Sequence, residues 1–547
     1  MPRVANPILP GFHPDPCLVR VGEWYYLATS TFEWWPGVRI HRSRDLATWE
    51  LAGYALTRRS QLDLRGVPDS GGVWAPALSY ARGQFWLAYT NTRSLNGPFK
   101  DLRNYLVTAP AAEGPWSEPV ALNASGFDPS LFHDDDGRSW LVNQLWRPST
   151  GVDAFAGIVL QEYSRTEHRL VGEPKNIFRG SSLGITEGPH LYRKDGFYYL
   201  VTAEGGTGWN HAVTVARSRA IDGPYELSPH HPLLTSRDDP ANPLQKAGHA
   251  SFVSTPAGEW FLAHLCSRPV GPHRRCILGR ETALQRVDWP AGDWPRLAGG
   301  GHAPRVVVDV PDASAWPSGR TASGEPRLGE EVPPYLPTFA DDFAAPALDP
   351  QWNTLREPAD PSWLSLAERP GWLRLRGRHS LQSAFDQSAL GFRLLHHRCR
   401  VGVQLDFAPR TFQQQAGLAL FYNGANFYSA FVTADDAGSR CLQLLACDNR
   451  RHRFLLEAPR ALPGSGAIEL SAELDGGTLR FFVATDAPDS APAPLGPPLD
   501  ATILSDDYPA EGGVGWAFTG AFAVLCAQDA SDAAPPADFT HFEYRCI

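Results

Sequence analysis

The chain has 547 residues, which exceeds the usual size of one domain and predicts at least two. Its net charge of −10, with no Lys/Arg-rich run, excludes the basic face that nucleic-acid binding needs. No stretch approaches the roughly 18–20 apolar residues that span a membrane, so we expect neither partner.

The first half of the chain contains an internal repeat of five similar segments. In each, a short apolar strand and an aromatic strand flank a turn that contains glycine, which is typical of a β-hairpin. The leucines of the aromatic strands recur at intervals of 60, 54, 59 and 62 residues: Leu27, Leu87, Leu141, Leu200 and Leu262. This spacing favours a five-bladed β-propeller over residues 1–305 rather than unrelated hairpins in an irregular sandwich.

The amino-acid composition changes after the repeats. Residues 306–337 are rich in proline, small and acidic residues, which predicts a linker. Alternating apolar and polar residues return in 338–547, as at 372–375 and 401–405, and indicate a two-sheet β-sandwich of the concanavalin-like jelly-roll type. The fold class is therefore predicted to be all-β.

The eight cysteines are scattered and form no CxxC pair. This predicts free thiols in a reducing compartment rather than a structural metal cluster. Because the sequence begins at Met1 and runs without an apolar signal core into sequence typical of a folded domain, we expect a cytoplasmic protein.

The first strand of each repeat has a functional side chain at or next to its start. Around the expected ring these are Asp15, Trp74, Asp128, Glu187 and His249. Equivalent positions of propeller blades converge on one mouth of the central channel. Three carboxyl groups in one pocket raise one another's pKa, and such an arrangement suits glycoside hydrolysis, which needs a protonated acid beside a base.

Several motifs resemble those of glycoside hydrolase family 43, and within it the two-domain β-xylosidases. They lie in the first domain at 6–16 (NPILPGFHPDP), 30–34 (STFEW), 70–76 (SGGVWAP), 126–132 (GFDPSLF) and 186–190 (TEGPH), and in the second at 381–383, 414–418 and 518–522. The resemblance covers nearly the whole chain. It implies an inverting, exo-acting hydrolase that releases xylose from the non-reducing ends of β-1,4-xylooligosaccharides.

The same resemblance implies roles for particular residues. Asp15 is the expected general base, Glu187 the general acid, and Asp128 the residue that tunes the pKa of the acid and orients it. Five further residues are expected to bind the sugar: Phe32, Trp74, Arg280, His249 and Phe518, the last from a loop of the sandwich. No cofactor is expected to be required, although His249 matches a histidine that lies beside a hydrated calcium ion in some relatives.

Two other functions stay open at this stage. The chain could act mainly as an α-L-arabinofuranosidase, because xylopyranose and arabinofuranose present similar hydroxyl patterns. It could also be a non-catalytic sugar-binding propeller, although retention of all three carboxylates argues against a binder. A sandwich loop that closes the pocket of a neighbouring subunit would suit a homo-oligomer, which is the predicted assembly.

Overall fold

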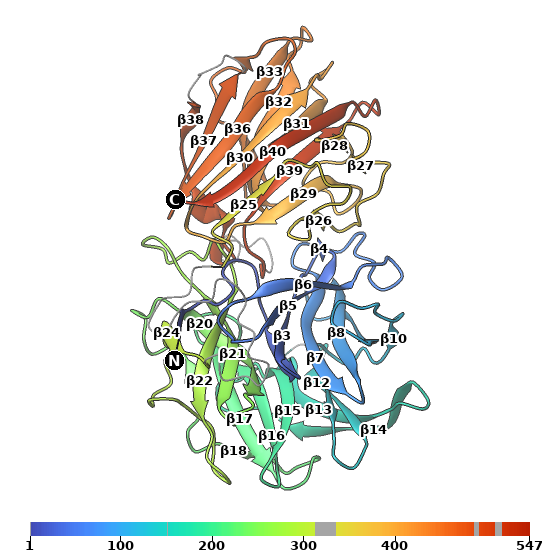
Figure 1. The fold of residues 1–547 in the computed structure, drawn as a ribbon, viewed down its shortest axis with the longest axis vertical. Helices are drawn as coiled ribbons and strands as arrows, with labels where there is room; N and C mark the ends of the chain where they lie inside the picture. Colours follow the sequence, from blue (N-terminus) through green and yellow to red (C-terminus); the bar gives the residue numbers. More distant parts are fainter. Residues whose placement is uncertain (1, 150, 312–334, 486–491, 509–516) are drawn as a thin grey trace.

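The computed structural model describes residues 2–149, 151–311, 335–485, 492–508 and 517–547 (Figure 1). It is all-β, with a five-bladed propeller and a two-sheet sandwich, as predicted. The described residues include a 3-10 turn, η2 (Ala501–Leu504), and two further helical residues, Asp507 and Tyr508. In that same part of the chain, no helix has the length and apolar character needed to cross a bilayer.

The propeller consists of five antiparallel blades. The first comprises β2 (Cys17–Val21), β3 (Trp24–Thr29), β5 (Gly37–Ser43) and β6 (Glu50–Leu56). The second comprises β7 (Gly72–Ala81), β8 (Gln84–Ser94), β9 (Asp101–Ala109) and β10 (Val120–Ala121). The third comprises β11 (Ser130–His133), β12 (Ser139–Trp146), β13 (Phe155–Ser164) and β14 (Arg169–Phe178).

The fourth blade comprises β15 (Glu187–Lys194), β16 (Phe197–Glu204), β17 (Ala212–Ser218) and β18 (Glu226–Leu227), with β19 (Leu234–Thr235) also paired to β17. The fifth comprises β20 (Gln245–Ser254), β21 (Trp260–Ser267), β22 (Glu281–Asp288) and β23 (Arg296–Leu297). A short pair then joins the two ends of the propeller chain, β1 (Arg3–Ala5) with β24 (Val307–Asp309).

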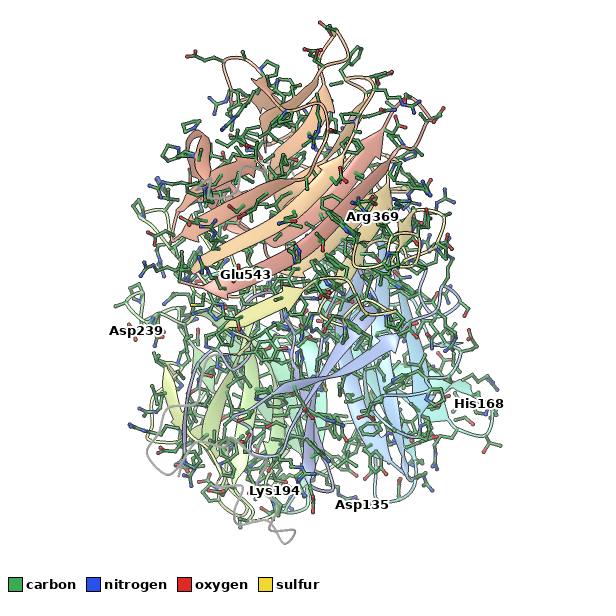
Figure 2. All side chains as sticks on the ribbon, turned by 45° about the horizontal axis from the view of Figure 1, so that its top comes forward. Asp135, His168, Lys194, Asp239, Arg369 and Glu543 are labelled. Carbon is green, nitrogen blue, oxygen red and sulfur yellow. The ribbon has the colours of Figure 1, made fainter. Side chains whose placement is uncertain are left out.

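Each predicted repeat forms the first hairpin of a blade. The turn glycines all have positive φ, a conformation that glycine adopts without a Cβ penalty: Gly22, Gly83, Gly137, Gly196 and Gly258. Asp135 and Lys194, at two of these turns, lie at the end of the propeller far from the sandwich (Figure 2). The starts of the first strands therefore lie at the end that faces the sandwich.

The sandwich packs two sheets around an extensive apolar core. One sheet runs in the order β27 (Leu364–Ser365), β28 (Leu373–Arg376), β40 (Pro536–Cys546), β30 (Arg398–Phe407), β36 (Ile468–Asp475), β37 (Thr478–Thr485) and β38 (Ala493–Asp500), with β25 (Thr338–Asp341) paired to β40. Most of the predicted linker, residues 312–334, lies outside the described residues.

The other sheet of the sandwich extends into the propeller. It runs in the order β34 (Arg451–Phe454), β33 (Arg440–Asp448), β32 (Asn426–Ala434), β31 (Gln414–Asn423), β39 (Phe522–Asp529), β29 (Ser388–Arg393), β26 (Asn353–Leu355) and β4 (Trp34–Trp35), with β35 (Arg460–Ala461) paired to β33. Strand β4 lies in the connection between β3 and β5 of the first blade, so a propeller segment is hydrogen-bonded to the edge of this sheet. Trp34 also stacks on Phe522 with ring centroids 3.8 Å apart, which joins the two domains at the mouth of the propeller.

Candidate active site

The five blades share a backbone feature where their first strands approach the channel. The residues at the equivalent positions, Asp15, Ala75, Asp128, Gly188 and His249, have φ values of 54°, 33°, 54°, 57° and 44°. Non-glycine residues with positive φ are uncommon and often occur at functional sites. Every blade therefore has one residue in the left-handed backbone conformation at this position. Trp74 and Glu187 each come one position before that residue in their blades.

A cavity of about 170 Å³ opens at this mouth of the channel. All eight residues predicted for the site line it: Asp15, Phe32, Trp74, Asp128, Glu187, His249, Arg280 and Phe518. Seven come from the propeller, and Phe518 comes from the sandwich of the same chain. The wall that the sandwich contributes to this pocket therefore comes from the same chain as the carboxyl groups.

Asp15 is held by groups from three blades. The hydroxyl of Ser30 donates a hydrogen bond of 2.6 Å to Oδ2 of Asp15, and the same hydroxyl accepts one of 2.8 Å from the backbone N–H of Ala75. Nδ1 of His249 lies 3.7 Å from Oδ1 of Asp15. The carboxylate is thus fixed in orientation, as a group that must accept a proton from one direction requires.

Asp128 lies between Asp15 and Glu187 in chain order and is electrostatically coupled to both. The backbone N–H of Gly188 donates a 3.0 Å hydrogen bond to its Oδ2, and the N–H of Asp128 itself donates to Oγ1 of Thr90 at 3.2 Å. Burial raises the pKa of Asp128 well above its usual value, and the charges of Glu187 and Asp15 raise it further. The contact with Gly188 also ties Asp128 to the residue next to Glu187.

Glu187 has the electrostatics of a general acid. Burial raises its pKa to about 8; the guanidinium of Arg280 opposes this rise and the charge of Asp15 adds to it. A carboxyl group with that pKa holds its proton at neutral pH and can deliver it to a leaving oxygen. At the same pH, this pocket can therefore pair a protonated acid with a carboxylate.

Aromatic rings form the wall beside the carboxyl groups. The ring centroids of Phe32, Trp74 and Phe518 lie within 5.8–6.3 Å of one another in pairs. The guanidinium carbon of Arg280 lies 4.4 Å from the centroid of the Phe518 ring. Such apolar faces suit the C–H faces of a sugar ring, while the carboxyl and guanidinium groups can bond its hydroxyls.

Ser70 links the aromatic residues of the two domains. Its carbonyl oxygen accepts a 2.9 Å bond from Nε1 of Trp74, and its hydroxyl accepts one of 2.9 Å from the backbone N–H of Phe518. The N–H of Ser70 donates to the buried carboxyl of Glu33 at 3.1 Å. Burial raises the pKa of Glu33 to about 8, although Arg356 opposes the rise.

Arg280 and Phe518 are brought together by a close approach of two backbone segments. The N–H of Ala521 donates to the carbonyl oxygen of Ile277 at 3.0 Å. A Cβ at Gly279 would lie 2.0 Å from the carbonyl oxygen of Thr519, and one at Gly520 would lie 2.4 Å from that of Leu278. Only glycine fits at these two positions. Gly279 directly precedes Arg280, and Gly520 comes two residues after Phe518.

Sequence reasoning missed seven residues that line the cavity: Lys100, Phe127, Trp146, Phe155, Ile185, Gly206 and Thr207. Phe127 precedes Asp128 in a recognised motif, so that motif could have indicated it. Its ring packs against Trp74 at 5.5 Å and against Phe155 at 6.0 Å. Lys100 lies 4.8 Å from the ring of Trp146 and comes from the loop between β8 and β9, where no local pattern marks it.

The surroundings of His249 do not form a calcium shell. Calcium takes six to eight oxygen ligands, whereas His249 interacts with the carboxylate of Asp15 and with the imidazoles of His190 and His211. Burial lowers the pKa of His249, which Asp15 opposes, and the cationic Arg280 lowers it further. A nitrogen-rich, cation-flanked position of this kind does not supply the oxygen ligands that a hard divalent ion takes from protein groups.

In the described part of the chain, one group of three ligand-type side chains lies close enough to hold a metal: Cys276, Asp506 and Asp507. The ammonium of Lys246 already occupies this cluster. It lies 3.1 Å from both carboxylate oxygens of Asp506 and 2.7 Å from Oδ1 of Asp507. The cluster is therefore an ion pair between the propeller and the sandwich.

A propeller channel with a protonated acid, a fixed carboxylate and sugar-sized aromatic walls defines a glycoside hydrolase. Comparison with known proteins gives the particular family. Residues 4–295 match glycosyl hydrolases family 43, and residues 340–545 match the β-xylosidase C-terminal concanavalin A-like domain. The chain belongs to glycoside hydrolase family 43.

Full-length relatives share both domains. The chain is 45% identical to the xylosidase/arabinosidase 43B of Humicola insolens, covering 100% of this chain and 98% of that protein. It is 43% identical to a β-xylosidase of Bacillus subtilis over 99% of each. The crystal structure of a xylan β-1,4-xylosidase from Bacillus halodurans superimposes with a TM-score of 0.92 at 49% identity, covering 99% of this chain and 100% of that one.

Proposed function

We propose that the protein is an exo-acting, inverting β-xylosidase that releases xylose from the non-reducing ends of β-1,4-xylooligosaccharides. The observation that carries this proposal is the convergence of Asp15, Asp128 and Glu187 on one small cavity with a pKa of about 8 at Glu187. The names of the full-length relatives support the choice of xylose. The cavity volume of about 170 Å³ suits one pentose ring better than a chain of sugars.

The reaction is a single displacement at the anomeric carbon. Glu187 donates its proton to the glycosidic oxygen as the bond from carbon to that oxygen breaks. Asp15 accepts a proton from a water molecule whose oxygen forms the new bond from the opposite face. Such a water needs carboxyl groups roughly 6.5–9.5 Å apart, against about 5–5.5 Å in a retaining pair. We assign Asp128 the role of orienting Glu187 and tuning its pKa, because its Oδ2 accepts the N–H of Gly188, the residue after the acid.

The test is hydrolysis of xylobiose followed by proton NMR from the first minutes. Release of α-xylose before mutarotation supports both exo-xylosidase activity and inversion. Early β-xylose overturns the inverting assignment and makes Asp15 a candidate nucleophile. The Glu187→Gln variant should lose roughly 10²–10⁴-fold in rate and lose the alkaline limb of the pH profile, because general acid catalysis contributes about that much.

Side activity on α-L-arabinofuranosides is the second candidate. It is favoured by the full-length similarity to the Humicola insolens xylosidase/arabinosidase. Comparing kcat/KM on the aryl xyloside and the aryl arabinofuranoside separates the two. Because a Vibrio relative at 43% identity is named a xylan 1,3-β-xylosidase, β-1,3-linked xylobiose belongs in the same comparison.

We further propose that catalysis needs no resident metal and that the enzyme works in the cytoplasm. The carboxyl groups supply both proton transfers, so dialysis against EDTA should leave the rate unchanged. All eight cysteines are free thiols, seven of them buried, which fits a reducing compartment. Assembly into a homo-oligomer stays a prediction, which sedimentation velocity would test.

A further inference from the structure

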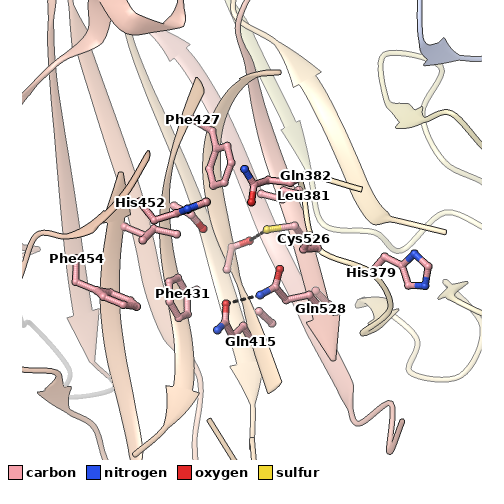
Figure 3. Close-up of a pocket in the computed structure, with 16 residues that line it drawn as sticks. His379, Leu381, Gln382, Gln415, Phe427, Phe431, His452, Phe454, Cys526 and Gln528 are labelled. Carbon is pink, nitrogen blue, oxygen red and sulfur yellow. Dashed lines mark hydrogen bonds between the residues drawn. The ribbon is translucent and has the colours of Figure 1, made fainter. Parts of the chain in front are cut away.

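A second cavity, of about 220 Å³, lies on the sandwich (Figure 3) and shares no lining residue with the catalytic pocket. It is formed by the nine-stranded sheet, by the loop between β28 and β29, and by β34. Its lining residues are His379, Ser380, Leu381, Gln382, Gln415, Ala416, Gly417, Phe427, Ser429, Phe431, Leu445, His452, Phe454, Cys526, Ala527 and Gln528. Nothing in the proposed hydrolytic step uses any of them.

The cavity lies on the face of the sheet that points away from the core of the sandwich. On β39, Ala523 and Leu525 enter that core, whereas Phe522 and Cys526 belong to the cluster shared with the propeller. Because successive strand residues alternate between faces, Gln528 lies on the outer face with Phe522. On β39, the outer face therefore includes both Phe522, at the contact with the propeller, and Gln528, in the lining of the cavity.

The lining has the chemistry of a site for a neutral, hydroxyl-rich ligand. None of the sixteen described lining residues is Asp, Glu, Lys or Arg, although 20% of the chain is charged. Amide, hydroxyl and imidazole groups alternate instead with the rings of Phe427, Phe431 and Phe454. An ionic ligand would find no counter-charge here, whereas a sugar offers apolar C–H faces to the rings and hydroxyls to the amides.

Two amides keep hydrogen-bonding capacity for such a ligand. Nε2 of Gln528 donates to Oε1 of Gln415 at 2.6 Å, which uses one polar atom of each side chain. The NH₂ of Gln415 and the carbonyl oxygen of Gln528 have no partner among the described residues, and both side chains are only partly buried. Phe454 is 58% exposed and lines the cavity, so its ring is accessible for stacking on a sugar face.

We propose that this cavity is a second, non-catalytic binding site for xylooligosaccharides. The choice of xylose units rests on the proposed function; the preference for a neutral sugar rests on the lining alone. The site has no carboxyl pair, so it binds without cleaving. Phe522 and Gln528 are six residues apart on β39, or roughly 20 Å. A bound chain would therefore raise the local concentration of substrate ends near the catalytic pocket.

The test is calorimetric titration of the full chain carrying Glu187→Gln with xylohexaose. Two binding events per chain are expected. Adding Phe454→Ala or Gln415→Leu should weaken one event about fivefold to tenfold and spare the other. The matched control is Phe412→Ala, since Phe412 is also 58% exposed on the sandwich but does not line the cavity. In the otherwise unchanged enzyme, Phe454→Ala should raise KM for xylohexaose and leave hydrolysis of a short aryl xyloside unaltered.

Three outcomes overturn the second site. One is a single binding event in the Glu187→Gln protein, and another is equal weakening by Phe412→Ala. The third is a change in sedimentation mass caused by Phe454→Ala, which would make the cavity a contact between copies of the chain. The proposed function fails separately: absent hydrolysis of xylobiose with binding that still depends on Phe454 would overturn the β-1,4-xylosidase assignment alone.

Discussion

At the scale of single residues, the charge of Arg280 sets the working range of Glu187. Burial raises the pKa of Glu187 to about 8 in spite of the opposing guanidinium. Removing that cation destabilises the ionised form, so Arg280→Met should raise this pKa and move the alkaline limb of kcat/KM to higher pH. Overall activity should fall too, because a sugar contact is lost. Initial rates on an aryl xyloside between pH 5 and 10 measure both effects.

The matched control is Arg138→Met, at an exposed hairpin turn of the third blade. It should leave the profile unchanged. An unmoved alkaline limb in Arg280→Met would contradict the electrostatic origin of the limb. A limb that moved to lower pH would contradict the assignment of Glu187 as the acid.

Ser70 is predicted to position the aromatic wall rather than to touch the sugar. Ser70→Gly removes the hydroxyl that accepts the N–H of Phe518, and glycine tolerates the positive φ of 61° at this position. The N–H of Phe518 is part-buried, and the loss of one hydrogen bond costs about 0.5–1.5 kcal/mol. We therefore expect kcat/KM to fall roughly tenfold, mostly through KM, with the pH profile unchanged. A fall confined to kcat, or a shifted profile, would show that Ser70 acts on the acid and not on the wall.

At the scale of elements, the glycine contact between the two domains should be necessary for activity. In Gly279→Ala the new Cβ would clash with the backbone of Thr519, so the segments that carry Arg280 and Phe518 must separate. A displacement of about 1 Å at a catalytic site can cost on the order of 10²-fold in rate. Aryl xyloside kinetics and thermal unfolding measure the two consequences.

The control for backbone strain is Gly258→Ala in the same blade. Gly258 has φ +83° against +72° at Gly279, but nothing lies within 4 Å of the position that a Cβ would take there. It should cost about 1 kcal/mol of stability with no loss of activity. Equal losses of activity in both variants would show that strain, and not the domain contact, matters.

How much of the fold could be predicted from the sequence depends on how far apart in the chain the contacting residues lie. The blades were predictable because each first hairpin is local, with its turn glycine between two apolar strands. Asp15, Asp128 and Glu187 followed from the repeat, since equivalent positions meet at the channel. The pairing of β4 with β26 and the position of Lys100 were not predictable, because they depend on contacts between distant segments that leave no periodic pattern.

At the scale of the whole molecule, a buried ion pair joins the fifth blade to the sandwich. Lys246 and Asp506 are each about 3% exposed at the side chain. Burial alone would lower the pKa of Lys246, but the carboxylates of Asp506 and Asp507 raise it above its ordinary value. Burial and the charge of Asp507 raise the pKa of Asp506 to about 7. The ammonium is thus the group that stabilises two adjacent carboxyls, of which Asp506 is buried and Asp507 partly buried.

Lys246→Met should therefore destabilise the protein by about 3–5 kcal/mol, the usual cost of leaving a buried charge unpaired. The cost should depend on pH with a definite sign. Without the ammonium, the folded-state pKa of Asp506 rises further above its unfolded value, and the pKa of Asp507 loses the lowering effect of Lys246 while burial still raises it. The native state then binds more protons than the unfolded state, so stability falls as pH rises. Urea unfolding at pH 5 and pH 8 should show the larger loss at pH 8.

Adding Asp506→Asn and Asp507→Asn to Lys246→Met should recover most of the lost stability, because the uncompensated charges are gone. If the triple variant were no more stable than Lys246→Met, the loss would come from packing around the lysine stem and the ion pair would not be what joins the domains.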